Sequence, residues 1–265
     1  MARRLEDLTE LEKLALIPMS YSRLNTYDMC EAMYFYNYIV KEPQVFGAAA
    51  KLGNVLHSVL ENTLEANEPV EQYDLSKYEA EFELQLSEQD PDSLIPEKLR
   101  NDGHVMIQQF LDRNEGTSFP IEAKEKPFQI VIGSAYIRGF IDRVDIEGDR
   151  VTITDYKSGR KEVSAKNAPN DLQLGLYALA MSLEYPDKEI YAQLYYLRSD
   201  RLKGHLFTRD DLVSVEERFL KLVQDVINKN TFHFTPNKNI CGFCDFAREG
   251  VCSVGVKRNR YKSWQ

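Results

Sequence analysis

The spacing of apolar residues divides the chain into a helical first half and a mixed second half. Leucine recurs every four residues from Leu52 to Leu64, which predicts a helix over about 48–64. Ser20 is a favourable N-cap residue and predicts the start of a long helix rich in aromatic residues. Weaker helical patterns occupy 71–87 and 94–113, on either side of the segment DPDSLIP.

A period of two residues replaces the helical pattern from Phe128 onward. The segments FQIVIG, AYIRGFIDRVDI and RVTITDYK predict three consecutive strands. We expect a helix over 170–183, a strand over 190–197 and a last helix over about 209–228. This order of elements predicts an α/β fold.

The length and composition are those of a globular protein. A chain of 265 residues with 43% hydrophobic residues can form one main domain with a small attached lobe. Eighteen apolar residues never occur in a row, and the first twenty residues mix charges into their apolar positions. We therefore expect a soluble, cytoplasmic protein with no membrane partner.

The net charge of −9 is unevenly distributed. Residues 61–102 hold 13 acidic and three basic side chains, so this arm carries −10 and the other residues sum to +1. The acidic excess therefore does not exclude nucleic acid, although nucleic acid prefers basic surfaces. The segment VKRNRYKSW at 256–264 is basic, and it is either a phosphate-binding tail or a solvated chain end.

A short turn fixes the pairing of the second and third predicted strands. The sequence IEGDRV places the two-residue turn signal Gly148-Asp149 between two strand patterns. The resulting register puts Asp142 opposite Asp155, on the same face as two apolar pairs. Their Cβ atoms would lie roughly 4.5–5.5 Å apart, where like charges destabilise a sheet.

A divalent cation between the two carboxylates would turn this repulsion into attraction. Lys157 lies two residues beyond Asp155 on the same face, so an ammonium group reaches the same place. Oxygen ligands suit Mg²⁺ or Mn²⁺, and such a cation beside a lysine suits phosphodiester hydrolysis. The alternative is an ordinary surface, in which Asp142 pairs with Arg138 or Arg143 and Lys157 faces solvent.

GFIDRVD followed by DYKSG resembles the PD-(D/E)XK nuclease superfamily, and most of all its RecB-like branch. LGNVLHSVLE and DLQLGLYALAM resemble the first and last motifs of that branch, and the motifs occur in the family's order. The resemblance implies a restriction-endonuclease-like core with four metal ligands, namely His57, Asp142, Asp155 and the backbone carbonyl of Tyr156. It also implies that Lys157 orients or activates the attacking water, and that Gln173 and Tyr177 contact DNA.

The four cysteines form a second group of candidate ligands. Cys241, Cys244 and Cys252 lie in CGFCDFAREGVC, and Cys30 lies far upstream. In an intracellular chain this pattern favours a metal centre or plain thiols over disulfides. One early and three late cysteines resemble the iron–sulfur nucleases of the same superfamily (AddB-type nuclease domains, exonuclease V and CRISPR adaptation nucleases), which implies a [4Fe-4S] cluster. Seven residues separate Cys244 from Cys252, more than is usual in those proteins, so a structural Zn²⁺ or free thiols stay as alternatives.

These observations lead to one expected organisation and activity. We expect an N-terminal helical arm over 1–117, a nuclease core over 118–230 and a cysteine lobe with a basic tail over 231–265. The expected activity is metal-dependent cleavage of DNA, more exonuclease than endonuclease, on single strands or ends in repair, recombination or processing. Arg23 is expected to contact phosphate, and a helicase or recombination protein to be a partner at the nucleoid. The alternative is a non-catalytic nucleic-acid-binding or assembly subunit stapled by the cluster.

Overall fold

A computed structural model describes residues 2–9, 12–13, 16–42, 47–71, 74–242 and 244–255. The strands are β1 (Arg3–Arg4), β2 (Ile17–Met19), β3 (Ile121–Ile132), β4 (Ala135–Glu147), β5 (Arg150–Lys157), β6 (Glu189–Tyr196) and β7 (Arg201–Phe207). The α-helices are α2 (Tyr21–Met29), α3 (Glu31–Tyr34), α4 (Ala48–Thr63), α5 (Leu75–Gln89), α6 (Glu97–Asn114), α7 (Leu172–Glu184), α8 (Arg209–Ile227), α9 (Lys238–Cys241) and α10 (Asp245–Arg248). The 3₁₀ segments η1 (Leu5–Asp7) and η4 (Ala165–Asn170) and the π-helical segment η2 (Phe35–Val40) complete the described elements.

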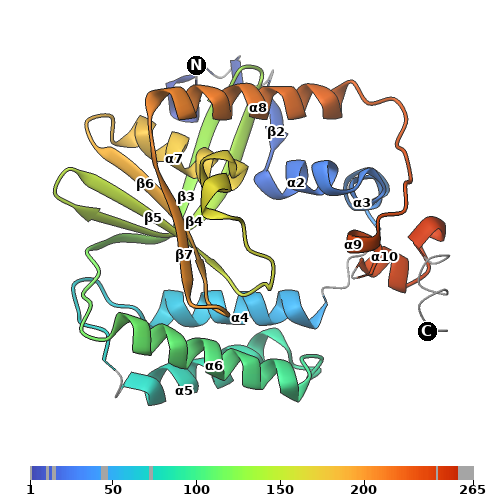
Figure 1. Cartoon of the computed structure of the whole chain (residues 1–265). Helices are drawn as coiled ribbons and strands as arrows, with labels where there is room; N and C mark the ends of the chain where they lie inside the picture. The colour runs from blue at the N-terminus through green and yellow to red at the C-terminus, as the bar shows by residue number, and fades with distance from the viewer. Residues whose placement is uncertain are drawn as a thin grey trace.

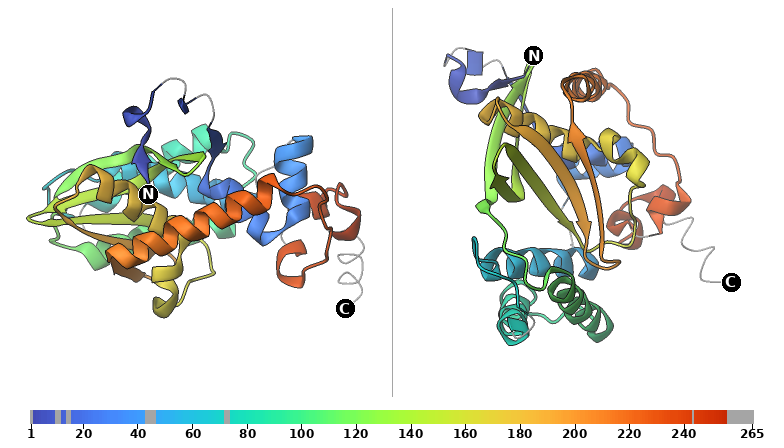
Figure 2. Two further views of the ribbon diagram at one scale, coloured as in Figure 1. Left: turned by 90° about the horizontal axis from the view of Figure 1, so that it is seen from above. Right: turned by 60° about the vertical axis from the view of Figure 1, so that its left-hand side comes forward.

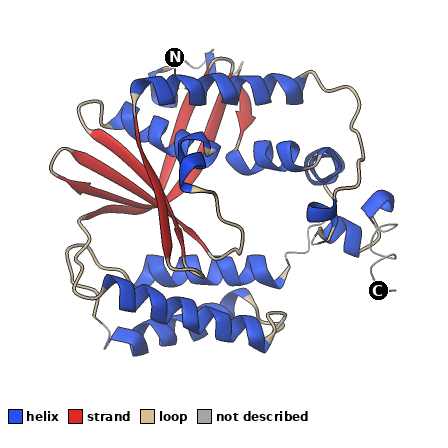
Figure 3. Ribbon diagram, in the orientation of Figure 1, coloured by secondary structure: helices blue, strands red, loops and turns tan. Residues whose placement is uncertain are grey.

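The strands form one mixed sheet, so the expected α/β class is confirmed (Figures 1 and 3). Its order is β1-β3-β4-β5-β6-β7, and β2 pairs in parallel with β4. The expected antiparallel meander is β3, β4 and β5. Strands β5 and β6 are parallel, and α7 forms the crossover that a parallel pair requires.

Helices cover the two faces of the sheet as separate layers (Figure 2). On one face, Val144 and Ile153 of the hairpin share a core cluster with α7 and with Phe219 of α8. On the other face, Tyr156 and Tyr195 share a second cluster with α4, α5 and α6. The end of β5 therefore lies between two cores, and its alternate side chains belong to different layers.

The predicted hairpin register is confirmed for its five paired positions. Pairing runs from Glu147 opposite Arg150 to Arg143 opposite Thr154. Gly148 has a φ of +54°, a conformation that this turn needs and that glycine adopts without strain. Because the ladder stops at the pair Arg143 and Thr154, the next residues of the two strands are free to take other partners.

The first predicted long helix is interrupted. Helix α2 ends at Met29, and Cys30 is extended with φ −162° and ψ 113°, acting as the C-cap of α2 and the N-cap of α3. This break redirects the chain, so that the ring of Tyr36 in η2 lies 5.2 Å from that of Phe246 in α10. The break has no local sequence signal, since no glycine or proline stands at Cys30.

Two stretches of strand carry little of the alternation that predicts strands. Strand β7 has one buried residue along RLKGHLF, Phe207, because the strand lies at the edge of the sheet. Strand β3 begins at Ile121 rather than Phe128, and its first half, IEAKEKP, is highly charged. Neither segment packs a regular apolar face against a helix, so neither shows a period of two.

A small third cluster lies beside α3. Its buried members include Ala32, Cys244, Phe246 and Cys252, which bring the start of the chain and α10 together. The basic segment at 256–264, expected to bind phosphate or to be a solvated chain end, lies outside the described residues. Within the described ranges, each helix is too short or too polar to cross a membrane.

Candidate active site

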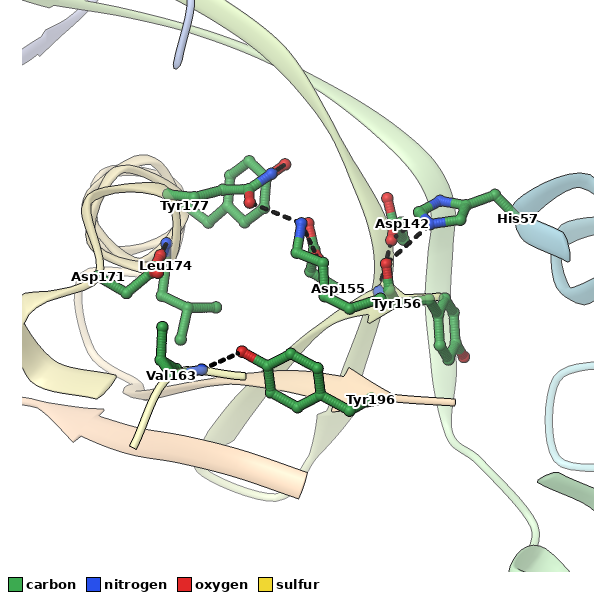
Figure 4. A network of polar contacts seen from close by, with 11 residues as sticks. His57, Asp142, Asp155, Tyr156, Val163, Asp171, Leu174, Tyr177 and Tyr196 are labelled. Atoms are coloured by element: carbon green, nitrogen blue, oxygen red, sulfur yellow. Dashed lines mark hydrogen bonds and ion pairs between the residues drawn. The ribbon is translucent and has the colours of Figure 1, made fainter. Parts of the chain in front are cut away.

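Asp142 and the β5 segment Asp155–Lys157 meet where the β4–β5 ladder ends (Figure 4). The backbone N–H of Tyr156 donates a hydrogen bond to Oδ2 of Asp142 at 2.7 Å. This side-chain bond takes the place of the next backbone pairing between the strands. The Asp142 carboxylate is therefore held against β5 at the point where the strands separate.

His57 reaches the same point from α4, on the other side of Asp142 (Figure 4). Its Nδ1 lies 3.3 Å from Oδ2 of Asp142, and its Nε2 lies 2.8 Å from the carbonyl oxygen of Tyr156. Burial disfavours the charged ring, but the hydrogen bond and charge of Asp142, together with the charge of Asp155, raise the pKa of His57 to about 9. Both ring nitrogens thus face oxygen atoms, an arrangement that favours the imidazolium.

Asp155 is buried, with only 2% of its surface exposed. The ammonium group of Lys157 lies 2.6 Å from its Oδ2 as an ion pair, yet among the described residues this oxygen receives no well-directed hydrogen bond. Burial raises the pKa of Asp155; the charge of Lys157 opposes this and that of Asp142 adds to it. Burial disfavours the charged form of Lys157, but the charge of Asp155 outweighs it and raises the pKa of the ammonium.

Gln173, in the segment DLQLGLYALAM, contacts Lys157. Nζ of Lys157 donates to Oε1 of Gln173 at 2.8 Å, and Nε2 of Gln173 donates to the hydroxyl of Tyr177 at 2.9 Å. Tyr177 is only 6% exposed, and its ring lies edge-on to Phe128 at 5.6 Å. In this arrangement Gln173 and Tyr177 orient Lys157, and their contact with DNA stays a prediction.

The ordinary-surface alternative pairs Asp142 with Arg138 or Arg143, but Arg143 has other partners. Its guanidinium pairs with Asp145 at 3.1 Å, donates to the hydroxyl of Tyr156 at 2.7 Å and lies 3.9 Å from the ring centre of Phe119. These contacts occupy Arg143 within the core on the α4 side of the sheet. The Arg143–Asp145 pair is therefore structural.

Glu125 of β3 is a member of the site that the sequence analysis did not single out. One ligand atom each from His57, Glu125 and Asp142 lie within 4.8 Å of one another. Pairing of Lys124 with Arg143 and of Lys126 with Ile141 brackets Glu125 opposite Asp142. Only the β3–β4 register could have indicated it, and the charged start of β3 hides that register in the sequence.

The residues present fit a divalent cation. The carboxylate of Asp142, the imidazole of His57 and the carbonyl of Tyr156 converge, and this mixture of oxygen and nitrogen donors suits Mg²⁺ or Mn²⁺. Among the described residues, Asp155 offers no oxygen within 4.8 Å of both the His57 and the Asp142 ligand atoms. The buried Oδ2 of Asp155 still has capacity to accept a ligand bond. Burial raises the pKa of Asp155, and repulsion from Asp142 raises it further. A cation between the two carboxylates would turn this repulsion into attraction.

The four cysteines line one cavity beside α3 and α10. Cys241, Cys244 and Cys252 are buried, Cys30 is half-buried, and all are free thiols. In the described part of the chain, no three of their sulfur atoms lie within 4.8 Å of one another. Burial disfavours the charged thiolate and so raises the pKa of the Cys244 thiol.

Arg23 lies at the start of α2 and is engaged within the protein. Its Nε donates to the hydroxyl of Tyr34 at 3.0 Å, and its Nη1 donates to the carbonyl of Pro18 at 3.2 Å. The guanidinium also lies 5.5 Å from the ring centre of Tyr38. Arg23 therefore fixes the start of α2, and its contact with phosphate stays a prediction.

Comparison with known families agrees with this geometry. The family model of the PD-(D/E)XK nuclease superfamily matches residues 18–252, which include the hairpin, His57 and all four cysteines. The chain therefore belongs to the PD-(D/E)XK nuclease superfamily.

Two individual proteins are similar to parts of this chain. The Gene 69 protein of Mycobacterium phage L5 is 32% identical over 133 residues, or 48% of this chain and 43% of the phage protein. One of the subunits of the ATP-dependent helicase/deoxyribonuclease of Alkaliphilus oremlandii is 26% identical over 254 residues, or 80% of this chain and 21% of the Alkaliphilus protein. The chain thus spans less than half the length of either relative.

The fold has a counterpart among crystal structures. A protein from Eubacterium rectale named "Putative exonuclease" superimposes with a TM-score of 0.54, covering 91% of this chain and 92% of its own. Sequence identity between the two is 13%, so this likeness concerns the fold alone.

Proposed function

We propose that this chain is a Mg²⁺- or Mn²⁺-dependent deoxyribonuclease. The observation that carries the proposal is the placement of Asp142 and Asp155 at the end of a hairpin, with His57 3.3 Å from Asp142 and Lys157 2.6 Å from Asp155. Such a set of ligands beside an ammonium group suits hydrolysis of a phosphodiester bond. Membership of the nuclease superfamily supports the same activity.

Each residue has a role in this proposal. His57, Asp142, Asp155 and the carbonyl of Tyr156 would hold the cation, which when bound supplies Lewis acidity toward the scissile phosphate. Binding would require His57 to give up a proton and replace its hydrogen bond to Tyr156. Lys157 would orient the attacking water and stabilise negative charge, because Asp155 and Gln173 hold its ammonium beside the reacting group.

We further propose an exonuclease that acts on single strands or ends and works with a helicase. Support comes from the name of the Alkaliphilus relative, which pairs helicase and deoxyribonuclease, and from the name of the Eubacterium protein. The experiment is cleavage of 5′-labelled and 3′-labelled DNA, single-stranded and duplex, with Mg²⁺, Mn²⁺ or chelator. Progressive shortening from one end supports an exonuclease, internal cuts indicate an endonuclease, and intact DNA under all conditions contradicts the proposed activity.

We also propose that the four cysteines hold a [4Fe-4S] cluster. All four line one cavity, and four thiolates are the usual ligand set for such a cluster. A zinc ion with Zn–S bonds of about 2.3 Å would hold its sulfurs within about 4 Å of one another. The wider spacing among the described cysteine sulfurs favours a polynuclear cluster over zinc.

Such a cluster would join Cys30, where α2 gives way to α3, to the segment after α8. The test is metal analysis and absorbance of anaerobically purified protein, with Cys30→Ser as the variant. We expect about four irons per chain in the wild type and loss of iron in the variant. One zinc per chain, or no metal, would contradict the cluster and leave the nuclease proposal untouched.

A further inference from the structure

Glu125 occupies a compartment on the β3 side of Asp142, away from Lys157. A small cavity of about 10 Å³ lies there, lined by His57, Glu61, Glu125 and Asp142 among others. Its volume is about that of one water or one small ion. Glu125 has a φ of +44°, which departs from the regular course of β3 beside this cavity.

Two of the residues that line this cavity, Lys124 and Arg143, are basic, but their charged ends contact other groups. Lys124 donates to the carbonyl oxygens of Glu61 and, at 2.8 Å, Leu64 at the end of α4. Lys126 pairs with Glu184 at 2.8 Å, and Arg143 pairs with Asp145 at 3.1 Å. The charged groups of Lys124, Lys126 and Arg143 are thus paired with groups other than the carboxylates of Glu125 and Asp142.

The carboxylate of Glu125 shares the positive charge of His57 with Asp142, and it loses this counter-charge when His57 gives up its proton on binding a cation. Among the described residues it makes no hydrogen bond and no ion pair, while Asp142 lies close enough for both to contact one ion. Two carboxylates in a partly buried space repel each other unless a cation lies between them. The imidazole of His57 completes a set of donors that suits Mg²⁺ or Mn²⁺.

We propose that Glu125 is a cation ligand and that, with His57 and Asp142, it forms a second divalent-cation position on the β3 side of Asp142. Asp142 would be shared with the position at Asp155, so the site would take up two cations. A neutral imidazole offers one nitrogen lone pair, so with both positions filled His57 would bind the cation at Glu125, and Asp142, Asp155 and the carbonyl of Tyr156 would hold the other. Paired cations that share a carboxylate are suited to phosphodiester hydrolysis. The inference rests on the proposed function for its purpose, but the cation position itself is defined by the three side chains.

The test is the number of Mn²⁺ ions bound per chain, measured by electron paramagnetic resonance titration of anaerobically purified protein. We expect two ions for the wild type and one for Glu125→Gln, a substitution that keeps size and removes charge. Glu122→Gln is the matched control, because Glu122 lies on the same strand but is exposed. The control should bind two ions, and thermal unfolding of both variants checks that they are folded.

The outcomes separate this inference from the proposed function. Equal numbers of bound Mn²⁺ in wild type and Glu125→Gln overturn the second position, even if the wild type cleaves DNA. Loss of one ion in Glu125→Gln, with no DNA cleavage by the wild type, supports the second position and contradicts the nuclease proposal. Loss of one ion from both the variant and the Glu122→Gln control overturns the assignment to Glu125.

Discussion

Oδ2 of Asp142 accepts a hydrogen bond from the backbone N–H of Tyr156 at 2.7 Å, just where backbone pairing between β4 and β5 ends. The same carboxylate is thus both a structural acceptor and a proposed ligand. Asp142→Asn keeps an acceptor oxygen for the N–H of Tyr156 but loses the charge, so we expect cleavage to fall more than about 100-fold while the protein stays folded.

Asp142→Ala separates the two roles. Without the carboxylate, the N–H of Tyr156 loses its acceptor, at a cost of about 1–3 kcal/mol in the free energy of unfolding. Urea unfolding of both variants checks the difference. An alanine variant as stable as the asparagine variant would contradict the structural role of Asp142.

Gln173 is expected to act as a positioning residue for Lys157. Gln173→Ala removes the acceptor at 2.8 Å from Nζ and should lower kcat by about 10- to 100-fold, the usual effect of losing a supporting contact. KM for DNA should change little. Steady-state kinetics distinguish positioning of Lys157 from a direct contact with DNA. Loss of a direct contact would raise KM and leave kcat unchanged. Gln129→Ala, at an exposed position of β3, is the control.

Asp90 should make stability depend on pH. This carboxylate accepts the N–H groups of Leu94 and Ile95 and pairs with Lys51 at 3.1 Å. Burial alone would raise its pKa, but the hydrogen bonds from Ile95, Lys51 and Leu94 outweigh burial and lower the pKa of Asp90 in the folded protein. The ionised group therefore stabilises the fold above its unfolded pKa of about 3.9, and this stability is lost as pH falls through the lower folded value.

We expect Asp90→Asn to lower the free energy of unfolding at pH 7 by about 3 kcal/mol, because Lys51 loses a buried partner. Urea unfolding from pH 7 down to pH 3.5 should show the gap between wild type and variant closing below about pH 4. Asp92→Asn, at an exposed position nearby, should show no gap at any pH. A gap for Asp90→Asn that is independent of pH would contradict the prediction.

Gly175 allows α7 to pack closely on α8. A Cβ atom at Gly175 would lie 2.4 Å from Cγ2 of Val215, which as a branched residue has little freedom to move away. Gly175→Ala should lower the free energy of unfolding by about 1–3 kcal/mol, despite the gain in helix propensity. Thermal unfolding measures this. Gly159→Ala, with no atom within 4 Å of the new Cβ, should be neutral.

The sequence predicted those parts of the site that depend on local signals. The turn at Gly148 fixed the hairpin register, and that register brought Asp142 close to Asp155. The prediction that Val144 and Ile153 lie on the same face of the hairpin is also confirmed, since both belong to one core cluster. These features depend on a few neighbouring residues, so periodicity and turn chemistry suffice to predict them.

The features that the sequence did not predict depend on contacts between distant segments. Glu125 joins the site through the pairing of β3 with β4, and the charged start of β3 conceals that pairing. The break at Cys30 has no local helix-breaking residue. Strand β7 lies at the sheet edge, where exposed side chains need not alternate. In each case the tertiary arrangement outweighs the local pattern.

The most direct test of metal-dependent DNA cleavage by the hairpin carboxylates compares the wild type with a variant of Asp155. Single-turnover cleavage of labelled single-stranded DNA with Mg²⁺ is measured for the wild type and for Asp155→Asn, both checked for folding by thermal unfolding. We predict cleavage by the wild type that stops with chelator, and a loss of more than about 100-fold in the variant. Cleavage of equal rate by a folded Asp155→Asn variant, or none by the folded wild type, would contradict the proposed activity.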